Sequence, residues 1–143
     1  MTLHELQKLF PDATESTWHR HSNGGGWVEN TACVDASAYV GPGALVYGNA
    51  RVYENALVYG NAMVYGHARV YGNAWVYENA EIFGNSRVYG NAQVYGDASV
   101  SGNAWVYGNS RVYGNAQVYG DAQVYGDASV SGKALVYEND RVY

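Results

Sequence analysis

Valine recurs at every sixth position from Val28 to Val142, and Ile82 is its one substitute. The residue four places after each valine is small: alanine in most repeats, serine at Ser86 and Ser110, and aspartate only at Asp140. Residues four apart in an extended strand lie on the same face. Each six-residue repeat, or hexad, therefore predicts one short strand whose valine and small residue point into a core. A fixed short period of this kind is typical of a solenoid.

The middle of each hexad predicts a tight bend. A complete repeat runs Val46-Tyr47-Gly48-Asn49-Ala50-Arg51, with glycine usually in the third place and Asn or Asp in the fourth. These residues are the ones that best tolerate left-handed backbone angles. We therefore expect a bend after every strand and parallel sheets formed by stacked strands.

This pattern resembles the hexapeptide-repeat family of left-handed parallel β-helices, in which an aliphatic residue is followed four places later by a small one. The resemblance covers residues 28–143. It implies an all-β fold, namely a left-handed triangular solenoid of about six coils with three hexads, or eighteen residues, in each. The chain is also similar to uncharacterised bacterial and phage proteins that share a start like Gly25-Gly26-Trp27-Val28 followed by runs of VYGNA.

The segment before the repeats has a different pattern, so we divide the chain into a cap, residues 1–26, and a β-helix, residues 27–143. Apolar residues near the start have helical spacing: Leu3, Leu6, Leu9 and Phe10. Thr2 and Glu5 form a capping-box pair, and Pro11 should end the helix. The first coil of a parallel solenoid exposes unpaired backbone groups, and we expect the short helix to lie across that edge.

At its other end the chain stops inside a hexad, at Val142-Tyr143, with Asp140 in an inward position. A carboxylate there is tolerable only if water reaches it, so we expect the last coil to be open or frayed. Open strand edges tend to find partners. We therefore predict a homo-oligomer: a dimer through Asp140, Val142 and Tyr143, or the side-by-side trimer common in the family that the chain resembles.

The eighteen-residue period separates the outward side chains into three faces. One face combines a tyrosine ladder with arginines and tryptophan, residue types that are enriched at protein-binding hot spots. Its candidate binding residues are Arg51, Tyr53, Arg69, Tyr71, Arg87, Tyr89, Trp105 and Tyr107. Stacked tyrosines also stabilise a sheet without any partner, and bases can stack on such a surface. The other two faces carry apolar candidates for subunit contacts or cap docking: Leu45, Met63, Leu57 and Trp75.

Copied segments leave the significance of the arginine row open. Residues Gln93 to Gly102 recur as Gln123 to Gly132, thirty residues later. Because thirty is not a multiple of eighteen, the copied hexads fall on different faces.

Composition narrows the function classes. With eight basic and thirteen acidic residues the net charge is -5, which argues against a dedicated nucleic-acid binder. The single cysteine, Cys33, excludes an internal disulfide. Residues 1–10 are too short and too polar for a signal peptide or a membrane span, so we expect a cytoplasmic protein that does not enter the membrane.

Candidate chemistry is sparse. The family that the chain resembles includes acyltransferases with a catalytic histidine at a trimer interface, and His67 is the one histidine of the repeats. It stands where a bend residue is usual, and a general base needs an orienting partner and a cleft. The two histidines of His19-Arg20-His21 are too few for a zinc site. We predict no catalytic residue, metal or cofactor.

These observations predict a non-enzymatic binding or scaffold protein that acts through protein contacts on a rigid surface. The resemblance to phage proteins implies, by analogy, a phage-encoded accessory protein that blocks a bacterial host enzyme or defence complex. The alternatives are a trimeric acyltransferase-like enzyme using His67, and a nucleotide or nucleic-acid binding module.

Overall fold

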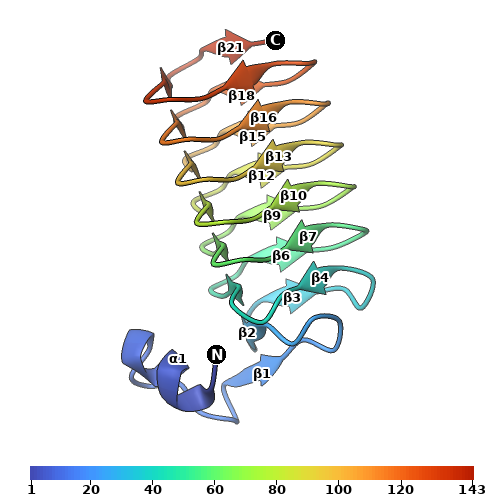
Figure 1. Cartoon of the computed structure of the whole chain (residues 1–143), viewed down its shortest axis with the longest axis vertical. Coiled ribbons are helices and arrows are strands. Elements are labelled where there is room, and N and C mark those ends of the chain that lie inside the picture. Colours follow the sequence, from blue (N-terminus) through green and yellow to red (C-terminus); the bar gives the residue numbers. More distant parts are fainter.

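The computed structural model describes all residues, 1–143, as a stack of coils with one helix at its N-terminal end (Figure 1). The helix α1 spans Leu3–Leu9, and every other regular element is a short strand. The strands form three sheets, A, B and C, along the three sides of the stack.

Each sheet takes every third strand of the repeats. Sheet A contains β1 (Trp18–Arg20), β2 (Trp27–Glu29), β5 (Leu45–Val46), β8 (Met63–Val64), β11 (Glu81–Ile82), β14 (Ser99–Val100), β17 (Gln117–Val118) and β20 (Leu135–Val136). Sheet B contains β3 (Cys33–Val34), β6 (Arg51–Val52), β9 (Arg69–Val70), β12 (Arg87–Val88), β15 (Trp105–Val106), β18 (Gln123–Val124) and β21 (Arg141–Val142). Sheet C contains β4 (Tyr39–Val40), β7 (Leu57–Val58), β10 (Trp75–Val76), β13 (Gln93–Val94), β16 (Arg111–Val112) and β19 (Ser129–Val130).

Strand pairing confirms the eighteen-residue coil. Val52 pairs with Val70, and Val70 pairs with Val88, in parallel register. All the other pairs within the repeats are parallel as well, and only β1 and β2 run antiparallel. The chain is therefore a parallel β-solenoid of about six turns with three sheets, as the resemblance to hexapeptide-repeat β-helices implies.

The core is one continuous cluster of 33 buried residues, made of the repeat valines, Ile82 and the small residues. Two coils place a serine hydroxyl in this apolar column. Ser86 Oγ donates to the carbonyl of Phe83 at 2.7 Å, and Ser110 Oγ donates to the carbonyl of Tyr107 at 2.8 Å. Because both hydroxyls are hydrogen-bonded, the polar atoms cost the core little.

The bends use left-handed backbone, as expected. At Gly102 φ is +63°, and a Cβ built on this residue would lie 2.7 Å from the backbone nitrogen of Gly120 in the next coil. Glycine is therefore required here both for its torsion and for the close approach of two backbones. Glu54, Glu78 and Glu138 occupy the same place in three hexads with φ of 58°, 57° and 54°.

The N-terminal helix has the predicted ends. The backbone N–H of Glu5 donates to the Thr2 hydroxyl at 3.2 Å, and the Glu5 carboxylate accepts from the Thr2 N–H at 3.3 Å, which completes the capping box. The helix ends at Leu9, and Phe10 is its C-cap, directly before Pro11. The capping box at the start of the helix and Pro11 after its end thus have the roles that the sequence predicts.

The position of α1 differs from the prediction. Leu6 packs with Trp18, Trp27 and Leu45, so the helix lies on the outer surface of sheet A instead of across the open edge. A helix cannot pair with a sheet edge because its own backbone groups are already bonded within it. Its apolar stripe needs an apolar surface, which the outward Leu45 and the partly buried Met63 of sheet A provide.

Other parts of the cap cover the edges. Strand β1 pairs with β2 along the edge of sheet A. In the following loop, the N–H of Gly26 donates to the carbonyl of Val40 at 2.9 Å, and the N–H of Val40 donates to the carbonyl of Asn23 at 3.0 Å, which closes the edge of sheet C. The buried His21 ring lies 2.7 Å from the carbonyl oxygen of Ala38 and seals the same region.

Of the two alternatives expected for the last coil, open or frayed, the structure shows an open but regular coil with Asp140 exposed. Strand β21 pairs with β18, and the N–H of Gln123 donates to the carbonyl of Asp140 at 2.9 Å. The Asp140 side chain is exposed and accepts a hydrogen bond from the N–H of Tyr137 at 3.2 Å. The carboxylate is tolerated in this position because it is exposed and hydrogen-bonded.

Candidate functional site

The candidate site is the outer surface of sheet B together with its tyrosine ladder, which we call the Tyr–Arg face. Register sets Arg51 beside Arg69, Arg69 beside Arg87, and Arg87 beside Trp105. These residues each precede an inward valine, so they point outward from the pleated strands. The structure therefore brings together the arginines and the tryptophan that the eighteen-residue period predicts.

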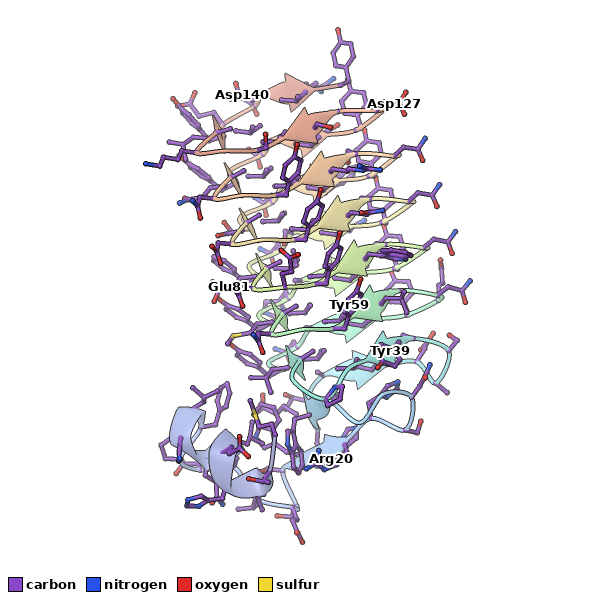
Figure 2. All side chains as sticks on the ribbon, in the orientation of Figure 1. Arg20, Tyr39, Tyr59, Glu81, Asp127 and Asp140 are labelled. Carbon is purple, nitrogen blue, oxygen red and sulfur yellow. The ribbon has the colours of Figure 1, made fainter.

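The tyrosines of this face form a continuous stack. The Tyr53 and Tyr71 rings lie 4.7 Å apart with their planes at 4°, and the Tyr71 and Tyr89 rings lie 4.9 Å apart with parallel planes. Tyr107 continues the stack at 5.0 Å from Tyr89. Figure 2 shows the equivalent row on the neighbouring face, rising from Tyr59.

These tyrosines are half-buried, although the sequence predicts that they point to solvent. Rings stacked at the coil spacing cover one another's faces. Burial raises the pKa of Tyr53 and of Tyr89, and the neighbouring tyrosines of the ladder add to the effect. Arg69 and Arg87 are half-buried as well, and Arg51 and Trp105 are the exposed members of the neighbouring row.

The arginine row has no anionic partner within the chain. Arg20 is the one arginine whose guanidinium makes hydrogen bonds. No carboxylate forms a salt bridge with Arg51, Arg69 or Arg87. Arg87 lies over the Trp105 ring at 5.3 Å from its centroid, a cation–π contact, and Trp105 itself is 36% exposed.

Two shallow depressions lie at the N-terminal end of this face. One is lined by Thr31, Cys33, Asn49, Arg51, His67 and Arg69. The other is lined by Cys33, Asp35, Arg51 and Tyr53. Sequence reasoning missed Thr31, Cys33 and Asp35 because the first hexads depart from the VYGNA pattern, and it missed Asn49 because the pattern assigns that residue only to a bend. The eighteen-residue spacing from Cys33 to Arg51 is the signal that could have found them.

His67 lies in the bend after β8, at the hexad position where asparagine is usual, and its side chain is exposed as expected there. Among the hydrogen bonds of the structure none is made by its ring, so no side chain orients it as a general base requires. No group of three His, Cys, Asp or Glu side chains is placed to hold a metal ion. The only helix has seven residues, and no helix of the structure could cross a bilayer.

The predicted contact residues on the other faces separate into two groups. Leu45 is 1% exposed beneath the cap, and Met63 is partly buried beside it. Because the cap covers Leu45, this residue cannot contact another subunit, and cap docking is the correct alternative for it. Leu57 and Trp75 pair on sheet C, where Trp75 remains 41% exposed. At the C-terminal end Tyr143 is 82% exposed beside Val142.

Three flat parallel sheets around a valine–alanine core, with a cap at one end and no loop leaving the repeats, define a β-solenoid whose outer faces are its available surfaces. The chain belongs to the YdcK β-solenoid repeat family. The family's sequence model matches residues 44–60, 62–78, 92–108, 104–120, 116–132 and 122–138, together more than half of the chain. No curated protein and no solved structure matches the chain. The resemblance to a repeat β-helix family is thus confirmed at that level, and the likeness to phage proteins stays a prediction.

Proposed function

We propose that this protein is a non-enzymatic binding scaffold that presents the Tyr–Arg face to a protein partner. The observation that carries the proposal is the outward row of Arg51, Arg69, Arg87 and Trp105 beside the stacked tyrosines, with no carboxylate paired to it inside the chain. Arginine, tryptophan and tyrosine are the residues most enriched at binding hot spots. The backbone is held coil to coil, so binding would order little that is not already fixed.

The finer parts of the proposal rest on resemblance and composition. We propose a cytoplasmic accessory protein, encoded by a phage, which blocks a bacterial host enzyme or defence complex by covering part of its surface. We also propose a homo-oligomer, either a dimer through Asp140, Val142 and Tyr143 or a side-by-side trimer. The apolar candidates for the trimer contact are Leu57, which is partly buried, and its neighbour Trp75, which is 41% exposed.

The repeats themselves supply a conservative test variant. The hexads at Ser99–Ser101 and Ser129–Ser131 carry serine on both sides of the valine and keep the same fold. The double variant Arg69→Ser with Tyr71→Ser reproduces this natural hexad on the Tyr–Arg face. Arg111→Ser with Tyr113→Ser makes the same change on sheet C and is the matched control.

The experiment is capture of proteins from bacterial lysate by the tagged chain, followed by mass spectrometry. We expect the wild type and the sheet C control to retain the same stoichiometric protein, and the sheet B variant to lose it. Circular dichroism should show the same strand signal for all three chains. Retention of the protein by the sheet B variant would remove the Tyr–Arg face from consideration.

A further inference from the structure

Charge is segregated around the solenoid. The outward residues that precede the valines of sheet B are Cys33, Arg51, Arg69, Arg87, Trp105, Gln123 and Arg141, so this row contains cations and no acid. Most acids of the repeats stand instead at or beside the bends: Asp35, Glu54, Glu78, Asp97, Asp121, Asp127 and Glu138. Figure 2 shows Glu81 of sheet A and Asp127 of a bend on opposite sides of the stack. Sheet B is thus a positive strip on a chain of net charge -5.

The strip is concentrated in three neighbouring coils. Arg51, Arg69 and Arg87 are direct neighbours in register, and strands of a sheet lie about 4.8 Å apart. Like charges on adjacent strands destabilise a sheet. No salt bridge offsets this repulsion in the folded chain. An external anion lying along the row would offset it, and a shallow depression lined by Arg51 and Arg69 gives it a place to lie.

We infer that the partner meets the Tyr–Arg face with a strip of carboxylates on an acidic protein segment that crosses Arg51, Arg69 and Arg87. This inference rests on the proposed function and specifies the partner's chemistry. Guanidinium groups bind carboxylates through paired hydrogen bonds. Trp105 and the stacked tyrosines give apolar contacts to the side chains between the acids.

A short acidic segment fits this strip better than a nucleic acid does. The row of adjacent arginines ends at Trp105 and Gln123, and the acids Asp35 and Asp127 stand in the coils beyond its two ends. A continuous polyanion longer than three coils would meet these carboxylates. A protein segment can place its acids opposite the arginines and neutral residues elsewhere.

The test uses two fluorescent peptides of equal length, one rich in glutamate and one with glutamine in the same places, and measures fluorescence anisotropy. We expect the glutamate peptide to bind the wild type at least tenfold more tightly than the glutamine peptide, with an affinity that falls as salt is added. Arg69→Gln with Arg87→Gln should weaken it at least tenfold. The control Arg111→Gln with Lys133→Gln makes the same change in net charge away from sheet B and should bind as the wild type does.

Other outcomes overturn one proposal or the other. Equal binding of both peptides, with the captured protein still lost from the Arg69→Ser, Tyr71→Ser variant, would refute the carboxylate strip and leave the binding face standing. Arginine-dependent binding of the glutamate peptide, with the captured protein retained by that variant, would refute the proposed function. A single-stranded oligonucleotide of matched charge that binds more tightly than the glutamate peptide, through the same arginines, would replace the acidic segment with nucleic acid.

Discussion

Replacing Gly102 with alanine tests how closely the coils stack at their bends. The ten residues that end at Gly102 are identical to the ten that end at Gly132, and φ is +63° at the first glycine and +64° at the second. A Cβ on Gly102 would lie 2.7 Å from the nitrogen and 3.0 Å from the oxygen of Gly120. A Cβ on Gly132 would have no atom within 4 Å. The two sites therefore share one torsion and differ in what lies above them.

The structure gives the size of the difference. Alanine in left-handed backbone costs about 1 to 2 kcal/mol at either site. To relieve the contact with Gly120, the two coils must separate there by roughly 0.7 Å to reach an ordinary contact of 3.4 Å. This movement stretches the 2.8 Å hydrogen bond from the N–H of Asn103 to the carbonyl of Gly120. It also stretches the next hydrogen bond between the same two coils, and each of these bonds is worth about 1 kcal/mol. We expect losses of about 2 to 4 kcal/mol for Gly102→Ala and about 1 to 2 for Gly132→Ala.

The assay is unfolding by heat and by guanidinium, monitored by circular dichroism. For a chain of this size, a loss of 1 kcal/mol lowers the midpoint of thermal unfolding by roughly 3 to 5 °C. Asparagine separates the two effects, because it tolerates left-handed backbone yet carries a Cβ. Gly102→Asn should keep the steric part of the loss, and Gly132→Asn should be almost neutral. Equal losses for the two alanine variants, or a neutral Gly102→Asn, would refute the steric reasoning.

Three further predictions concern Tyr47 beside sheet A, Leu6 of the cap and Ser86 of the core. Burial raises the pKa of Tyr47 to about 12, with smaller effects from Tyr65, Glu81 and Glu29. The pKa of tyrosine in the unfolded chain is about 10, so the neutral phenol stabilises the fold fully below pH 10. This stability is lost as the pH rises through about 12. Tyr47→Phe should therefore lose less stability than the wild type in urea titrations between about pH 10 and 12, and identical profiles would contradict this. Leu6→Ala should cost about 2 to 5 kcal/mol of cap docking and shift tryptophan emission to the red as Trp18 and Trp27 reach water, and unchanged emission would mean that the cap does not depend on this contact. Ser86→Ala should change the unfolding midpoint little, whereas Ser86→Val should cost about 1 to 3 kcal/mol because the slot holds an alanine-sized residue, and equal midpoints would show a looser core.

The repeats determine what the sequence predicts well. Val52 and Val70, or Arg51 and Arg69, lie side by side because the spacing of eighteen residues puts them one coil apart, and no other contact is needed to place them. The six-residue repeat predicts the valine core and the glycine at most bends. The Thr2–Glu5 capping box is equally local, so the helix ends are also correct.

The cap could not be derived in this way, since its contacts are long-range and occur once. The antiparallel pairing of β1 with β2, the contact of His21 with Ala38, and the packing of Leu6 on Leu45 follow no period. The half-burial of the tyrosines was missed for a different reason. Alternation along a strand gives the direction of a side chain, whereas its exposure depends on the ring in the next coil.

The core repeats every six residues, but a given outer surface repeats only every eighteen. A deletion of one hexad, such as residues 75–80, would leave each valine and alanine in an inward slot, so the shortened chain should still fold. Every side chain after the deletion would move to the neighbouring side of the triangle, and the strand Arg87–Val88 would join sheet A instead of sheet B. Changes of length by one or two hexads are therefore permissible for the fold yet disrupt any surface built across many coils. Only changes by three hexads preserve both, so length variants of this protein offer a direct way to separate folding from recognition.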